Sequence, residues 1–119
     1  MNVRNLSALT FTSTDPARLA AFYSEGLGIP FVLQQHGTLH AHHECDWAGI
    51  HYAILPFAPN LDAPVTPVFR ATDLGAAIEA AVSAGARLKF KPLSLGKGMT
   101  VVGLTDPDGN AFRLIHIGE

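Results

Sequence analysis

The chain has little of what marks a secreted, membrane-spanning or nucleic-acid-binding protein. Its 119 residues include a single cysteine, Cys45, so no disulfide can form within the chain. The longest apolar stretch, GIHYAILPFAP, is broken by histidine and proline and is too short to span a bilayer. The N-terminus lacks an apolar segment of signal-peptide length. The eight lysines and arginines are scattered and the formal net charge is -2, which argues against nucleic-acid or anionic-membrane partners. We expect a cytoplasmic protein.

What the chain does have is a globular composition and an internal repeat. Apolar residues make up 48% of the sequence and charged residues 15%, which is typical of a folded domain. Residues 8–31 and 66–90 resemble each other, because Phe11, Thr14 and Asp15 recur 58 positions later as Phe69, Thr72 and Asp73. Similarity in the same order and at a nearly constant shift indicates two copies of one structural unit.

Each copy starts with a short alternating strand and continues into a helix. Asp15 and Asp73 stand where a helix N-cap is needed, and Gly26 and Gly85 are typical of a left-handed helix end. Three strands are predicted after each helix, at about 30–36, 38–45 and 49–56 and at about 86–92, 98–104 and 111–117. A proline-rich segment, residues 56–65, links the copies. The fold class is therefore α+β, with two tandem βαβββ modules at about 5–57 and 65–118.

Three motifs follow one another in an order that resembles a known superfamily. They are DPARLAAFYSEGLGIPF, DLGAAIEAAVSAGA and TDPDGNAFRLI. Together they resemble the vicinal oxygen chelate superfamily, whose members include glyoxalase I, extradiol dioxygenases, fosfomycin-resistance enzymes and bleomycin-resistance binding proteins. The resemblance implies one domain with curved mixed sheets around a concave cleft, and a homodimer.

Strand alternation predicts which side chains line that concave face. The helix side takes the alternate apolar residues Phe11, Tyr52, Ile54, Phe69, Phe112 and Leu114. The concave side then takes Ala8, Thr10, Thr12, His51, Ala53, Leu55, Thr66, Val68, Arg70, Ala111, Arg113 and Ile115.

The resemblance also implies where a metal would bind, and the residues there do not suit one. In metal-dependent members four concave positions supply His, Gln or Glu ligands, and the corresponding residues are Ala8, Ala53, Thr66 and Arg113. Alanine has no donor atom, arginine is permanently protonated, and threonine is a poor ligand for such metals. We therefore expect no metal cofactor at the usual position.

Arg113 has two interpretations. It is either an ordinary ion-paired residue at a strand end, or it joins Arg70 in holding the carboxylate or phosphate of a ligand. In the second case Thr10, His51 and Thr66 would offer hydrogen bonds to the ligand. This favours a metal-independent small-molecule-binding protein, similar to the bleomycin-resistance branch.

The competing hypothesis is an enzyme, a glyoxalase-like lyase or dioxygenase with a relocated divalent transition metal. If DWAG (residues 46–49) forms a hairpin turn, Glu44 faces His51 and His42 faces Ala53. One strand face would then carry the metal set His40, His42, Glu44 and His51. A single histidine, His51 or His42, acting as a hydrogen-bond partner or an acid/base group is a further alternative, as are purely structural histidines. Cys45 alternates onto the helix side, which predicts a buried apolar residue and not a nucleophile.

Overall fold

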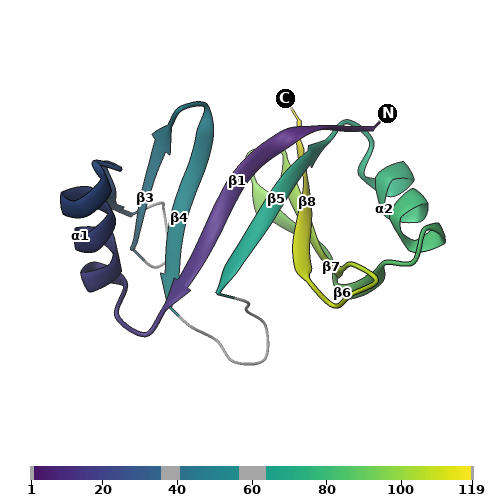
Figure 1. Cartoon of the computed structure of the whole chain (residues 1–119). Helices are drawn as coiled ribbons and strands as arrows, with labels where there is room; N and C mark the ends of the chain where they lie inside the picture. Colours follow the sequence, from purple (N-terminus) through teal and green to yellow (C-terminus); the bar gives the residue numbers. More distant parts are fainter. Residues whose placement is uncertain (1, 36–40, 57–63, 119) are drawn as a thin grey trace. The chain divides into compact units, whose positions relative to one another are not determined.

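The computed structural model of the chain describes residues 2–35, 41–56 and 64–118, and Figure 1 shows its elements. The hydrogen-bonded strand order is β2-β3-β4-β1 in the first module and β5-β8-β7-β6 in the second. The pairs β1–β4 and β5–β8 are parallel, whereas β2–β3, β3–β4, β6–β7 and β7–β8 are antiparallel. The predicted α+β class with two tandem βαβββ modules is confirmed. The elements are β1 (Val3–Ser13), α1 (Pro16–Leu27), β2 (Val32–Gln34), β3 (His42–Trp47), β4 (Ile50–Pro56), β5 (Val65–Ala71), α2 (Leu74–Ser83), β6 (Arg87–Gly96), β7 (Met99–Thr105) and β8 (Ala111–Ile117).

The chain divides into two compact units, and the division falls within β1. The first, here called the N-terminal unit, is Ala8–Thr66. The second, the C-terminal unit, is Pro67–Glu119 together with Met1–Ser7. The start of the chain is attached to the C-terminal unit by backbone hydrogen bonding, since the Thr72 N–H donates to the Asn2 carbonyl over 2.9 Å.

Helix α1 begins where the sequence predicts and ends two residues later than predicted. The Asp15 carboxylate accepts from the Arg18 N–H over 3.3 Å, which satisfies one free donor of the first turn. The left-handed residue is Gly28, with φ 73°, and not Gly26. The prediction of Gly26 was wrong because the closing bonds form further on. Gly28 N–H donates to Ser24 and Ile29 N–H to Tyr23, a pairing that requires the left-handed turn at Gly28.

Helix α2 follows the same plan. Asp73 is its N-cap, and its carboxylate accepts from the Ala76 N–H over 3.0 Å. The helix cap residue, Ala84, is right-handed, and the positive φ of 116° falls at Gly85, as the sequence predicts. Both predicted N-caps are therefore present.

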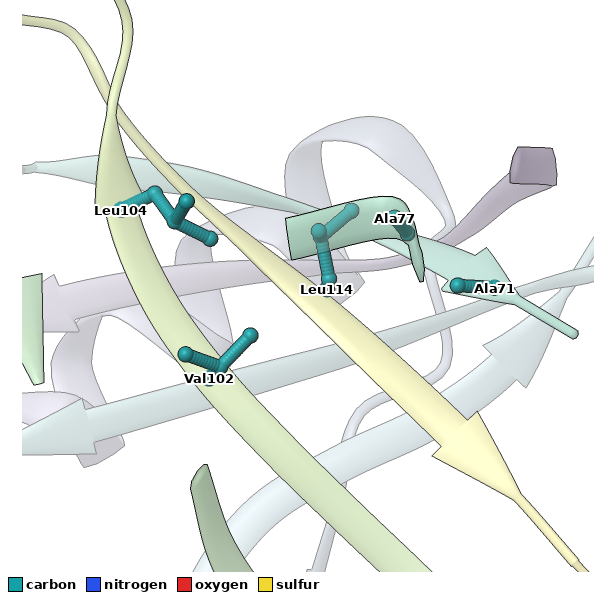
Figure 2. Close-up of a cluster of buried hydrophobic side chains, with 5 residues drawn as sticks. All are labelled: Ala71, Ala77, Val102, Leu104 and Leu114. Carbon is teal, nitrogen blue, oxygen red and sulfur yellow. The ribbon is translucent and has the colours of Figure 1, made fainter. Parts of the chain in front are cut away.

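Each unit buries its own apolar core between its helix and one sheet face, as the strand alternation predicts. In the N-terminal unit, Phe11, Tyr52 and Cys45 pack around the buried Ile54 together with residues of α1. In the C-terminal unit, Phe69 and Phe112 pack on a buried cluster that Figure 2 shows in close-up. The members of that cluster are Ala71, Ala77, Val102, Leu104 and Leu114. Thr10 and Ala53 lie on the opposite sheet face of the N-terminal unit, and Arg70 and Arg113 lie on that of the C-terminal unit.

The β3–β4 hairpin differs from the prediction in its turn. Asp46 and Trp47 belong to β3, and the turn consists of Ala48 and Gly49, with φ of 53° and 82°. Two positive φ values are the geometry of a tight two-residue hairpin loop, whose twist matches that of its strands. Asp46 therefore faces His51, and Glu44 faces Ala53 and not His51. The register differs by two residues, so the side chains stay on the predicted faces.

Strand lengths differ from the prediction more than strand positions do. Strand β2 has three residues where seven were expected, β6 runs on to Gly96, and β8 has the predicted bounds. Parts of the expected second and third strands fall on residues 36–40, and the core of the expected linker falls on residues 57–63, outside the described residues. In the described part of the chain, neither helix is long and apolar enough to cross a membrane.

Candidate functional site

The sheet face of the N-terminal unit that points away from α1 carries buried polar side chains. Thr10 and Glu44 both face Ala53 in register, one from β1 and the other from β3. All three are buried, with Thr10 and Glu44 each 8% exposed. Thr66, at the end of this unit, is also buried. A buried carboxylate needs hydrogen-bond partners to remain charged, so the surroundings of Glu44 decide what this face can do.

Two imidazoles provide those partners, and with two carboxylates they form what we call the Glu44 cluster (His42, Glu44, Asp46 and His51). Oε2 of Glu44 lies 2.9 Å from Nε2 of His42 and 3.2 Å from Nε2 of His51. The other ring nitrogen of His51, Nδ1, lies 2.9 Å from Oδ1 of Asp46. An ionised carboxylate only accepts hydrogen bonds, so Nε2 of His42 donates to Glu44 and Nδ1 of His51 donates to Asp46. The contact of His51 Nε2 with Glu44 is within ion-pair distance.

This arrangement differs from a metal centre in the direction of its donor atoms. A metal requires imidazole lone pairs directed at one point, whereas here the ring nitrogens point at a carboxylate oxygen. Among the described residues, no three His, Cys, Asp or Glu side chains are grouped so as to hold a metal ion. Of the metal set that the sequence suggests, the structure brings together His42, Glu44 and His51, while His40 lies outside the described residues. Asp46 was not in that set.

The residues at the four family metal positions can be placed within their own units. Ala8 faces His51 across β1 and β4, Ala53 is buried beside Thr10, and Thr66 is 5% exposed. Arg113 is the third residue of β8 in the C-terminal unit. Neither alanine side chain offers a donor atom to any ligand, so on the N-terminal unit polar contacts with a ligand would come from residues such as Thr10, Thr66 and the Glu44 cluster.

In the C-terminal unit, Arg113 lies on the face that points away from α2. Its register partners are Val68 on β5 and Gly103 on β7. Arg70 pairs with Ile115, two residues further along the same two strands, so the two arginines are diagonal neighbours on one face. Arg113 is half-buried and Arg70 exposed, whereas Val68 and Val101 beside them are each 6% exposed. This face therefore combines two permanent cations with an apolar floor.

A residue that the sequence reasoning missed also contacts this face. The guanidinium carbon of Arg113 lies over the Phe90 ring, 5.5 Å from its centroid, which is within the range of a cation–π contact. Phe90 comes from β6, and simple alternation from Leu88 would have placed it on the α2 side. The one signal in the sequence is the isolated glycine of VVGLT, Gly103, since a lone glycine in a strand indicates a bulge or a close approach.

Cys45 lies on the predicted face of β3 but is half-buried and not fully buried. It packs against the core on the α1 side, and burial raises the pKa of its thiol. The negative charges of Asp46 and Glu44 raise that pKa further. The thiol therefore stays protonated at neutral pH and is a poor nucleophile.

A hollow in the C-terminal unit lies apart from all of these groups. It has a volume of about 360 Å³, is open to solvent, and is lined by Thr72, Asp73, Leu74, Thr100 and His116 at the start of α2. His116 Nδ1 is 3.4 Å from the Ala71 carbonyl and can donate to it. Among the described residues, none of the site residues expected from the sequence lines this hollow.

Comparison with solved structures gives similar folds at low sequence identity. A hypothetical protein of Bacillus halodurans matches with a TM-score of 0.73 and 12% identity, over 97% of this chain and 95% of its own. A variant of Streptomyces coelicolor methylmalonyl-CoA epimerase, in complex with 2-nitronate-propionyl-CoA, matches with a TM-score of 0.69 and 15% identity, over 98% and 96%. A member of the glyoxalase/bleomycin resistance protein/dioxygenase superfamily from Vibrio splendidus matches with a TM-score of 0.64 and 14% identity, over 96% and 98%. At such identities the likeness concerns the fold alone.

At the level of sequence, the comparisons give a family and no individual relative. No curated protein matches the chain. The family model described as a glyoxalase-like domain matches residues 8–115, which include Arg113, most of the last strand and nearly all of the first module. On that match, the chain belongs to the glyoxalase-like domain family.

Proposed function

We propose that this protein is a metal-independent small-molecule-binding member of its family, and that its ligand carries a carboxylate or phosphate. The observation that carries the proposal is Arg113, a permanent cation on an apolar sheet face, at the strand position where the family resemblance would place a metal-binding carboxylate. A fixed positive charge repels a metal ion and attracts an anion. An arginine in place of a carboxylate therefore makes this position favour an anion over a cation.

The surroundings of Arg113 support an anionic organic ligand. Arg70 supplies a second guanidinium on the same face, and Val68 and Val101 supply apolar surface. Binding sites for small molecules combine apolar walls with a few placed polar groups, and guanidinium groups bind carboxylate and phosphate oxygens in pairs. On the N-terminal unit, Thr10 and Thr66 remain proposed hydrogen-bonding groups for a small molecule, whereas both ring nitrogens of His51 already face carboxylates and a ligand would have to displace one of them.

Metal independence rests on the chemistry of the residues at the family positions. Ala8 and Ala53 contribute no donor atom, and Arg113 contributes a positive charge. Arg113→Glu should therefore fail to create a metal site, because two of the four positions remain empty of ligands. Elemental analysis of protein purified without chelator tests this, and a stoichiometric transition metal that persists in Arg113→Glu and in histidine variants would contradict the proposal.

Ligand binding is tested by a thermal-shift screen of small carboxylates and phosphates, followed by calorimetry on the strongest hit. A charge-assisted hydrogen bond contributes ~1.5–3 kcal/mol. Arg113→Met should therefore weaken the hit about tenfold to a hundredfold without unfolding the protein. Arg18→Met is the matched control, since Arg18 is exposed on α1. Equal affinity of Arg113→Met and wild type for every hit would remove the basis of the proposal.

The second candidate function is the metal-dependent lyase or dioxygenase. It would use His42, Glu44 and His51, which lie together, but both imidazoles face one oxygen of Glu44 and would have to turn towards the metal ion to bind it. The test is elemental analysis of wild type and of His42→Ala, prepared in parallel. One metal per chain in wild type and none in His42→Ala would favour the enzyme.

A further inference from the structure

The pairing of strand β6 with β7 has three irregularities, and the first of them redirects one side chain. Leu88 pairs with Leu104 and Phe90 pairs with Gly103, so two steps along β6 correspond to one step along β7. Leu104 belongs to the core under α2, and its register partner Leu88 is on the same side of the sheet. The extra residue reverses the alternation, so Phe90 points to the opposite face, where Arg113 lies.

The redirected ring needs the absence of a side chain on β7. A Cβ atom built on Gly103 would lie 2.1 Å from Cε2 of Phe90 and 2.4 Å from its Cδ2, far inside van der Waals contact. The ring thus lies directly on the backbone of β7. All ten residues of β6 are described, and in this strand Phe90 alone is half-buried while the other nine are exposed. Its burial follows from this contact and not from the general position of the strand.

Arg113 completes the arrangement from the next strand. It is the register partner of Gly103 on β8, and its guanidinium carbon lies 5.5 Å from the centroid of the Phe90 ring. A bulge, a glycine and an aromatic ring on three neighbouring strands therefore converge on one cation. Strand bulges are often found beside functional sites, where they reorient a side chain.

We propose that Phe90 is a positioning residue for Arg113, seated on Gly103, and that the oriented guanidinium takes a carboxylate in preference to a phosphate. The inference rests on the proposed function, and it adds the class of ligand and a residue that fixes its geometry. The ring occupies one approach to the guanidinium, with its centroid 5.5 Å from the guanidinium carbon, and a carboxylate would bind along the nitrogen edge of the group. A planar carboxylate fits that edge with both oxygens in the guanidinium plane. A tetrahedral phosphate has oxygens outside the plane, towards the apolar ring.

The test compares three named probes: benzoate, its neutral analogue benzamide, and inorganic phosphate. Binding is followed by nuclear magnetic resonance of the Arg113 Nε–Hε signal, which is assigned by its loss in Arg113→Lys. In wild type this signal should show an upfield ring-current shift, and benzoate should move it whereas benzamide should not. Phosphate should bind more weakly than benzoate.

Variants of Phe90 separate positioning from folding. Phe90→Leu keeps apolar volume but removes the ring, so it should abolish the ring-current shift and weaken benzoate about two- to fivefold. Phe90→Tyr keeps the ring and should restore both. If Phe90→Leu does not fold, the wild-type shift and the wild-type preference for benzoate over benzamide and phosphate still decide the matter.

The outcomes also distinguish the inference from the function beneath it. Unchanged benzoate affinity and an unchanged Arg113 signal in Phe90→Leu overturn the inference, as does wild-type binding of phosphate that equals or exceeds that of benzoate. A screening hit that depends on Arg113 but not on Phe90 overturns the inference and leaves the proposed function standing. Hits that are indifferent to Arg113→Met overturn both.

Discussion

Replacing Gly103 by alanine tests the packing under Arg113 through stability alone, without any ligand. The added methyl carbon would lie 2.1 Å from a ring atom of Phe90, where carbon atoms in contact are ~3.5–4.0 Å apart. The ring must therefore move by about 1.5 Å, or strands β6 and β7 must separate. Gly103 is not among the glycines with positive φ, so alanine meets no backbone strain at this position.

The expected change in the free energy of unfolding of Gly103→Ala is the difference between two opposed effects. Overpacking of this kind costs about 1–3 kcal/mol. The smaller conformational entropy of the unfolded alanine chain offsets about 0.4–1 kcal/mol of that. The net loss in the free energy of unfolding should be ~0.5–2 kcal/mol, which corresponds to a fall in Tm of roughly 2–8 °C. Urea denaturation followed by circular dichroism measures the first quantity and a thermal scan the second.

Two controls make the result decisive. In the Phe90→Ala background the clash partner is gone, so Gly103→Ala should there be neutral or stabilising, which a double-mutant cycle records as coupling. Gly26→Ala in α1 has its nearest foreign atom, Cε1 of Phe22, at 3.8 Å, and should stabilise by ~0.5–1 kcal/mol. Equal or higher stability of Gly103→Ala in the wild-type background would refute the reasoning about the seated ring.

Three further predictions concern the helix caps, the closing turn and assembly. Asp15→Ala and Asp73→Ala should each cost ~1 kcal/mol of unfolding free energy, and an unchanged Tm in both would contradict the cap geometry. Hydrogen bonds donated by Asn110, first its backbone N–H, hold the pKa of Asp106 below its ordinary value of 3.8, so Asp106 stabilises the fold above that pH and the effect is lost as pH falls through the lowered pKa. Denaturation at about pH 5 and about pH 3 should therefore show a steeper loss for wild type than for Asp106→Asn. Sedimentation at tens of micromolar should give a homodimer, and a particle near 12.6 kDa would count against it.

The sequence was sufficient for the repeat, the helix starts and the sheet faces because each has a local cause. An N-cap aspartate bonds to a backbone three residues away, and strand alternation depends only on neighbouring residues. The β3–β4 turn was misjudged for the opposite reason. Both DWAG and the observed Ala48–Gly49 turn are compatible with the local sequence, and the choice depends on how two strands pair. The end of α1 was misplaced because two glycines compete, and bonding from Ile29 to Tyr23 selects the second.

The groups around Arg113 show where sequence reasoning ends. The pattern of β8 places Arg113 on the correct face, and that of β5 does the same for Arg70, since both strands are regular. Phe90 could not be placed, because one extra residue between Leu88 and Phe90 moves the Phe90 side chain to the opposite face of the sheet. Pro92 in β6 is compatible with a bulge but equally with a regular edge strand, so it does not locate the extra residue. The extra residue can be recognised only from the pairing of Phe90 with Gly103 on the neighbouring strand β7.

The Glu44 cluster and Arg113 both bear on whether this protein is a metalloenzyme or a ligand-binding protein, for different reasons. In the N-terminal unit, Glu44 is within hydrogen-bonding distance of two imidazoles, so a metal there must displace existing hydrogen bonds before it gains any bond of its own. In the C-terminal unit, the charge of Arg113 is permanent and repels a metal ion. The neighbouring Phe90 ring attracts the Arg113 guanidinium itself. Ala8 and Ala53 add no donor atom that would offset these two obstacles to metal binding. An anion, by contrast, meets a guanidinium whose motion is, in our proposal, already restricted by its contact with Phe90. A side chain that is ordered before binding loses less conformational entropy when the ligand binds.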